Sequence, residues 1–290
     1  MSSEKPSLPW ELYALKYAQM TTTRGHSFLG GVPDEGPLEM AYYVWLAKRG
    51  SEAVLIDTGF SKATADRRQR NWLRCPVESL AQLGVAPAEI SDLVVTHLHY
   101  DHAGNLNKAP NARLHLQSRE LQFATSRYMC VSHISLGGVF EADDVCTIVR
   151  KNFAGRLNLI DGEAEIKPGI RVYRAGGHTP GMQMVSVETQ RGKVIVMSDC
   201  AHLFENIAAQ KPFHIVFDLA DMMRGWRSGV ERAVSSDHVI PGHDPQVMNI
   251  YPAVAGLEGI AVKLHEPPSR SVLPQREALL QSLPEIANPA

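Results

Sequence analysis

The stretch Thr96-His97-Leu98-His99-Tyr100-Asp101-His102-Ala103-Gly104-Asn105 decides how this chain is interpreted. Three histidines and one aspartate lie within six residues of one another, directly after the apolar run Asp92-Leu93-Val94-Val95, which predicts a strand. Imidazole and carboxylate groups are the ligands that zinc and similar divalent ions accept. Because a loop that leaves a strand can turn several side chains toward one point, the stretch predicts a metal site at a strand end.

Three further candidate ligands each follow a short apolar run and open a turn. His178 follows residues 170–173, Asp199 follows residues 194–197, and His243 follows residues 238–240. Taken singly, the two histidines are explained equally well as turn residues, and the aspartate as a helix cap. Their order along the chain after the first cluster favours one shared metal site.

These four blocks resemble the metallo-β-lactamase superfold and, within it, the N-acyl-homoserine lactonase-like hydrolases. The resemblance runs from about residue 42 to residue 243. It implies an α/β (α+β) fold, an αββα sandwich of two mixed β-sheets flanked by helices. It also implies two divalent metal ions: one held by His97, His99 and His178, the second by Asp101, His102 and His243, with Asp199 bridging the two.

The resemblance further implies a hydrolase that opens a lactone or a related ester through a hydroxide held between the two ions. We expect zinc, with iron, manganese or cobalt as alternatives, because metal identity depends on supply as well as on ligands. Asp101 is expected to carry a proton to the leaving alkoxide, and Asp57 to orient a ligand histidine. This chain has His202 three residues after the bridging aspartate, where the lactonases have a tyrosine. Three roles are open for His202: it donates a hydrogen bond to the substrate oxygen, it binds metal, or it packs in the core.

Other members of the same superfold remain alternatives. A thioester hydrolase of the glyoxalase II type uses the same ligands, and cationic residues placed for a glutathione carboxylate would favour it. A β-lactamase-like amide hydrolase is disfavoured, because class B enzymes lack the bridging aspartate and use a cysteine; here Cys200 directly follows Asp199. A di-iron oxygen or nitric oxide reductase would have glutamate at His99. Absence of a Gly-x-Ser-x-Gly motif argues against a serine hydrolase, and clustered ligands argue against a scaffold role.

The composition indicates a globular protein that acts on a small molecule. The chain has 290 residues, of which 44% are hydrophobic, and its 29 basic and 31 acidic residues leave a net charge of −2. This balance predicts no nucleic-acid partner and no membrane partner. Residues 1–6 do not resemble a secretory signal, so we expect a cytoplasmic protein with four free, buried or partly buried cysteines.

We expect a single catalytic domain over residues 1–265 and an appendage over residues 266–290, which is a candidate contact for a homodimer. Residues 41–47 and 53–56 predict paired strands, and residues 76–83, 118–126, 219–234 and 276–283 predict helices. Within the third helix a buried stripe is expected at Leu219, Met222, Met223, Trp226 and Val230. Residues 127–154 predict either a roof over the substrate pocket or a helical hairpin on the core.

Overall fold

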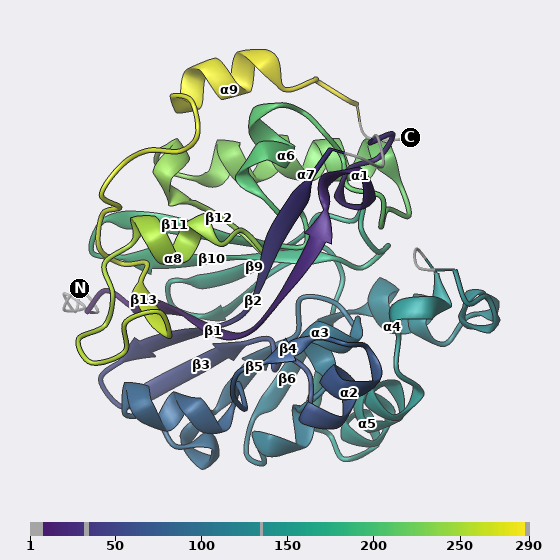
Figure 1. Cartoon of the computed structure of the whole chain (residues 1–290). Coiled ribbons are helices and arrows are strands. Elements are labelled where there is room, and N and C mark those ends of the chain that lie inside the picture. The colour runs from purple at the N-terminus through teal and green to yellow at the C-terminus, as the bar shows by residue number, and fades with distance from the viewer. Residues whose placement is uncertain (1–7, 32–34, 134–135, 288–290) are drawn as a thin grey trace, which may run out of the picture.

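Two mixed β-sheets lie face to face at the centre of the molecule, and helices cover their outer faces (Figure 1). The computed structural model describes residues 8–31, 35–133 and 136–287. Residues 1–6, two residues of the 127–154 segment and the last three residues of the tail therefore lie outside the described part. The αββα sandwich expected from the sequence is confirmed.

The first sheet has eight strands and joins antiparallel to parallel pairing. β2 pairs antiparallel with β1 and β3, whereas β3, β5, β6 and β7 run parallel. In spatial order the strands are β13 (Ala261–Lys263), β1 (Glu11–Thr23), β2 (Pro37–Arg49), β3 (Glu52–Ile56), β5 (Asp92–Val94), β6 (Arg113–Gln117) and β7 (Leu157–Ile160), with β4 (Asn71–Trp72) pairing with β1.

The second sheet has five strands, of which only the β11–β12 pair is parallel. Its order is β12 (Val239–Pro241), β11 (Gly192–Ser198), β10 (Gln183–Thr189), β9 (Ile170–Arg174) and β8 (Glu163–Lys167). Because parallel neighbours end at the same edge, the loops after β11 and β12 emerge side by side. The loops after β3 and β5 do the same in the first sheet.

The helices are short except for α5 and α7. The α-helices are α1 (Arg24–Ser27), α2 (Lys62–Arg67), α3 (Tyr100–Ala103), α4 (Ser118–Ala124), α5 (Ala142–Phe153), α6 (Phe204–Ala208), α7 (Leu219–Arg232), α8 (Gln246–Ile250) and α9 (Arg276–Ser282). The 3₁₀ helices are η1 (Glu78–Leu83), η2 (Pro87–Glu89), η3 (Leu106–Lys108), η4 (Arg127–Cys130), η5 (Gly137–Val139) and η6 (Ser236–His238).

Most of the elements predicted from the sequence are present. The paired strands and the helices at α4, α7 and α9 are confirmed, and the helix expected over residues 76–83 is a 3₁₀ helix that ends at Gly84, whose φ is 74°. The Asp218 side chain caps α7 by accepting from the Asp221 amide. The predicted stripe on α7 is wrong at Leu219, which is 42% exposed because the first turn of the helix extends past the core.

Side chains alternate along the central strands and divide the apolar residues between two cores. Trp45 and Ile56 point between the sheets, where they meet Val185 and Val196 from the second sheet. Leu46 and Leu55, one residue away in each strand, point to the outer face under the helices. A one-residue shift in register would exchange the two faces, so this pattern fixes where each strand ends and each loop begins.

The end of the chain lies against the second sheet's helices. α9 packs on α7, and Leu279 and Leu283 are buried in the same core as Trp226. The Arg227 guanidinium donates to the carbonyl oxygens of Leu280 and Leu283. The division at residue 265 stays a prediction.

Two remaining expectations concern the cysteines and the membrane. All four cysteines are free, but the expectation that they are buried is wrong for Cys130 and Cys146, which are exposed on η4 and α5. Cys200 is buried and Cys75 is partly buried. Within the described residues, no helix combines the length and the apolar character needed to cross a membrane.

Candidate metal centre

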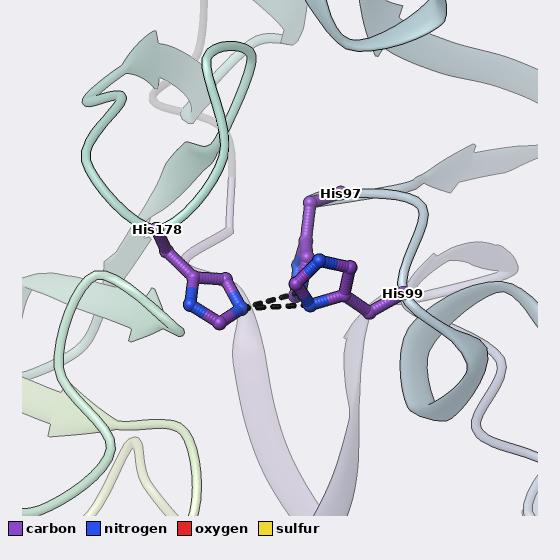
Figure 2. Close-up of side chains that lie close together, drawn as sticks. All are labelled: His97, His99 and His178. Atoms are coloured by element: carbon purple, nitrogen blue, oxygen red, sulfur yellow. Dashed lines mark hydrogen bonds between the residues drawn. The ribbon is translucent and has the colours of Figure 1, made fainter. Parts of the chain in front are cut away.

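Three histidines from two distant loops converge at the edge of both sheets (Figure 2). His97 and His99 lie in the segment that follows β5, and His178 lies in the loop between β9 and β10. The His178 Nε2 atom is 3.1 Å from Nε2 of His97 and 2.9 Å from Nδ1 of His99. These three nitrogen atoms therefore surround one point, as three ligands of a single metal ion would.

A second group lies beside the first and shares Asp199 with it. Nε2 of His102 and Nε2 of His243 lie 3.3 and 3.1 Å from Oδ1 of Asp199. Asp101 completes the group, with Oδ2 at 3.7 Å from His102 Nε2 and 3.8 Å from His243 Nε2. The other oxygen of Asp199, Oδ2, lies 3.3 Å from His178 Nε2. Oδ2 also lies 3.2 Å from His243 Nε2. The fold thus brings all seven residues predicted as ligands together, and Asp199 contacts both groups.

The remaining ring nitrogens show which way the histidine lone pairs point. Nδ1 of His178 donates to the Ile215 carbonyl at 2.8 Å, and Nδ1 of His243 donates to the Ala41 carbonyl at 2.9 Å. Nδ1 of His102 lies 2.8 Å from Oδ2 of Asp57. In the neutral form that binds a metal, each ring keeps its one proton on Nδ1, so its Nε2 lone pair faces the cluster.

Nitrogen and oxygen lone pairs therefore face one another at the centre of the cluster. Nε2 of His102 and Oδ1 of Asp199 are both buried, and neither makes a hydrogen bond within the described part of the chain. Buried acceptors that face one another without a proton between them are costly unless a cation lies among them. The donor set and these unsatisfied atoms fit divalent metal ions.

The electrostatics of the cluster agree with this arrangement. Burial lowers the pKa of His97 and His99 well below the usual value and lowers that of His178 to about 3, so these rings are neutral. Burial also opposes protonation of His102, but the carboxylates of Asp199, Asp101 and Asp57 together raise its pKa. Carboxylates that attract a proton to this point attract a metal cation to the same point.

Asp57 contacts both His102, which it was expected to orient, and the start of the loop that carries the first predicted ligands. It follows β3 with a φ of 63°, and its carboxylate accepts from the Thr96 amide and the Thr96 hydroxyl, both at 2.7 Å. The same carboxylate accepts a hydrogen bond from His102 Nδ1. Asp57 therefore fixes both the start of the ligand loop and the tautomer of one of its histidines.

His202 lies at the cluster and not behind Cys200. Its Nε2 atom is 3.0 Å from Oδ2 of Asp199, and its ring is buried on the side of His178. His178, Asp199 and His202 form a further group whose ligand atoms lie close enough to share one ion. Cys200 instead faces α7, where its sulfur would lie 2.8 Å from a Cβ at Gly225.

Glu120 is a buried residue of the site that the sequence did not predict. It lies in α4, and its Oε1 accepts from the amide of Leu98, between two ligand histidines. Its Oε2 accepts from the Thr179 hydroxyl at 2.6 Å and from the Gly181 amide at 3.1 Å. A sequence signal for this contact is Gly181, because a Cβ there would lie 2.2 Å from the Glu120 amide nitrogen. Burial raises the Glu120 pKa to about 7.

A cavity of about 380 Å³ opens onto the cluster. Asp101, Asp199, His202 and three ligand histidines form one wall, and further wall residues are Tyr42, Tyr100, Arg68 and Arg70. Ser132, Gly138 and Val139 from the 127–154 segment contribute to the lining, whereas Val145 and Ile148 of α5 in the same segment are buried in the outer core. The segment thus both lines the pocket and packs on the core.

Comparison with known proteins places this geometry among related folds. Residues 39–222 match the family model described as the metallo-beta-lactamase superfamily, which covers more than half of the chain. An N-acyl homoserine lactonase of Bacillus thuringiensis is 28% identical over 138 residues, which are 47% of this chain and 49% of the relative. Metallo-beta-lactamase domain-containing protein 1 of Rattus norvegicus is 30% identical over 215 residues, 71% of this chain and 66% of the relative.

The matches to the Bacillus thuringiensis relatives span about half of those proteins' length. Among solved structures, a quorum-quenching N-acyl homoserine lactone lactonase superposes with a TM-score of 0.68 and 20% identity. That alignment covers 82% of this chain and 94% of the other. At this identity the likeness establishes a shared fold.

Proposed function

Because the chain belongs to the metallo-beta-lactamase superfamily, we propose that it is a metal-dependent hydrolase that opens a lactone or a related ester. The observation that carries this proposal is the position of Asp199 between the two histidine groups: Oδ1 lies near His102, Oδ2 lies near His178, and His243 lies within 3.2 Å of both oxygens. A carboxylate placed in this way suits a bridge between two ions. The lactonases among the relatives and structural neighbours support the same reaction class.

Two divalent ions, which we propose to be zinc, would lower the pKa of a water molecule and polarise the substrate carbonyl. His97, His99 and His178 would hold one ion, and Asp101, His102 and His243 the other, with Asp199 between them. The neutral histidines leave most of the positive charge on the ions, which favours ionisation of water near neutral pH.

The protein's own groups would then bind and orient the substrate and move protons. Asp101 lines the cavity, which supports a role for its carboxylate in carrying a proton to the departing alkoxide oxygen. His202 lies at the same wall and would donate a hydrogen bond to the oxygen that gains negative charge. These two contributions, a proton for the leaving group and a hydrogen bond to the oxygen that gains charge, suit an ester or lactone, because its leaving group requires a single proton.

A thioester hydrolase of the glyoxalase II type is a second candidate. It would use the same ligands, and Arg70 in the cavity wall is a cationic group of the kind that such a substrate needs. A β-lactamase-like reaction has less support, because Cys200 faces α7 rather than the cluster.

The test is an assay of purified protein, with its metal content measured, against lactones, aryl esters and glutathione thioesters. We expect ester or lactone turnover that His178→Ala and Asp199→Ala abolish. His238→Ala is the matched control, because that histidine lies at the opposite end of β12 and contacts Arg191 and Ser235. Turnover that survives in both ligand variants would refute the proposal.

A further inference from the structure

Two arginines, Arg68 and Arg70, line the cavity, and they differ in whether a carboxylate pairs with the guanidinium. Both come from the segment that joins α2 to β4. Arg68 is neutralised: its Nη2 atom lies 2.8 Å from a carboxylate oxygen of Glu141, and its guanidinium lies 4.1 Å from the centre of the Tyr100 ring. Arg68 is therefore a structural cation that ties α2 to the loop before α5.

Arg70 lacks a carboxylate of this kind. Its Nε donates to the Tyr100 hydroxyl at 3.0 Å and its Nη1 donates to the Arg68 carbonyl at 2.9 Å. Its Nη2 makes no hydrogen bond, and no acidic oxygen lies within 4.0 Å of its guanidinium, among residues 8–31, 35–133 and 136–287. A guanidinium with a free donor edge in a cavity wall is available to bind an anion that enters the cavity.

The tyrosines around Arg70 do not supply that anion. A tyrosine hydroxyl carries no charge at physiological pH, so Tyr100 offers Arg70 a hydrogen-bond acceptor and no negative charge. The Tyr42 hydroxyl lies 3.5 Å from the Tyr100 hydroxyl and donates a hydrogen bond to the sulfur of Met20. Asp101 acts on Arg70 only at a longer range than an ion pair.

The backbone holds Arg70 in a fixed position relative to the cluster. Its amide donates to the Ala65 carbonyl at 2.8 Å, and the following residues, 71 and 72, pair with β1. Tyr100, which binds the guanidinium, stands between the ligands His99 and Asp101. A small molecule that reaches the metal cluster therefore has the Arg70 guanidinium in the same cavity.

We propose that the substrate carries an oxyanion group, a carboxylate or a phosphate, which Arg70 binds while the ester bond lies at the cluster. This inference rests on the proposed function, because it takes the cavity as the substrate site. Arginine recognises such groups through two parallel N–H donors, and Arg70 offers a free Nη2 for this purpose. Neutral acyl-homoserine lactones should accordingly be poor substrates.

The first test compares kcat/KM for phenyl acetate, 4-acetoxybenzoate and 4-acetoxyphenyl phosphate. For each anionic ester that the wild type prefers, we take the ratio of its kcat/KM to that of phenyl acetate. Arg70→Gln should lower this ratio by about 10- to 100-fold, the size expected for one charged hydrogen-bonded contact. The intrinsic reactivity of the esters cancels when wild type and variant are compared. The ester that loses most identifies the oxyanion as carboxylate or phosphate.

Matched variants separate charge from structure. Arg70→Lys should recover part of the ratio, because it keeps the charge without the planar guanidinium. Arg67→Gln should leave the ratio unchanged, since Arg67 is 56% exposed and pairs with Glu141 outside the cavity. An unchanged ratio in Arg70→Gln, with normal metal content, would overturn the inference.

Binding of benzoate, followed by calorimetry on the metal-loaded protein with benzyl alcohol as the neutral probe, gives a readout independent of turnover. Arg70→Gln should weaken benzoate binding about 10-fold or more and leave benzyl alcohol unaffected. Equal benzoate affinity in wild type and Arg70→Gln would mean that the metals alone bind the carboxylate and would refute the site. Arg70-dependent benzoate binding in a protein that hydrolyses none of the esters would uphold the anion site and refute the hydrolase proposal.

Discussion

The imidazole of His202 lies flat against the phenyl ring of Phe213, with ring centroids 3.6 Å apart and ring planes 9° from parallel. This stack fixes the plane of the imidazole, and its Nε2 edge points at Asp199 Oδ2. Burial lowers the pKa of His202, so the ring is neutral at physiological pH. A neutral imidazole held in this way has one nitrogen available to the cluster or to a substrate oxygen.

Replacing His202 distinguishes these two roles. If it donates to the substrate oxygen, His202→Ala should lower turnover about 10- to 1,000-fold while both metal ions remain bound. Loss of metal would make His202 a ligand, and no change in either quantity would give it a packing role only. His202→Tyr restores the residue type of the lactonases, so gain of acyl-homoserine lactone hydrolysis would show that this position selects the substrate.

Protein purified without chelators should contain close to two metal equivalents per chain. Seven ligand-type residues exceed the needs of one tetrahedral ion, and Asp199 faces both groups. Asp199→Ala should lower the metal content measured by elemental analysis while the fold, followed by circular dichroism, is retained. Full activity at one equivalent would contradict a two-metal mechanism.

Glu120 should control metal affinity without touching a metal. Its carboxylate joins the Leu98 amide to Thr179 and Gly181, so it sets the distance between the two histidine loops. Glu120→Ala should weaken metal binding about 10- to 100-fold, as loss of supporting contacts around a metal site does. Competition with a chelator measures the affinity, and Glu277→Ala, at an exposed glutamate of α9, is the control. Unchanged affinity would make Glu120 a packing residue.

Asp92 should stabilise the protein in a pH-dependent way. Burial opposes its ionisation, but hydrogen bonds from His115, Ser91 and Lys167 hold its pKa well below the usual range. Because the folded pKa lies below the unfolded one, the stabilisation is present above about pH 4 and is lost as the pH falls through the folded pKa.

Asp92→Asn should therefore lower the free energy of unfolding at pH 7 by about 1–3 kcal/mol, and the difference from wild type should shrink below pH 4. Urea unfolding of both metal-free proteins at several pH values measures it. Asp66→Asn should change little at any pH, because Asp66 makes an exposed ion pair with Lys62. A pH-independent difference would exclude the charge as the cause.

The ligand loops could be predicted from the sequence because each follows a strand and carries residue types with few other uses at such spacing. Arg70 and Glu120 could not, because each is a single charged residue whose role depends on distant partners. Glu120 contacts residues 22, 59 and 61 positions away, and no local pattern records such contacts. The exposed end of α7 at Leu219 was missed for a related reason, since helical periodicity does not show where the core stops.

The seven predicted ligands are divided between the two sheets, since the loop after β5 in one sheet supplies four and loops of the other supply three. The geometry of the cluster therefore depends on the position of one sheet relative to the other. A sideways slip of one layer by about 1 Å is enough to spoil such a constellation, even when every ligand is intact. Substitutions at Trp45 or Val185, which lie in the core between the sheets, would consequently weaken retention of the ions before they unfold the protein.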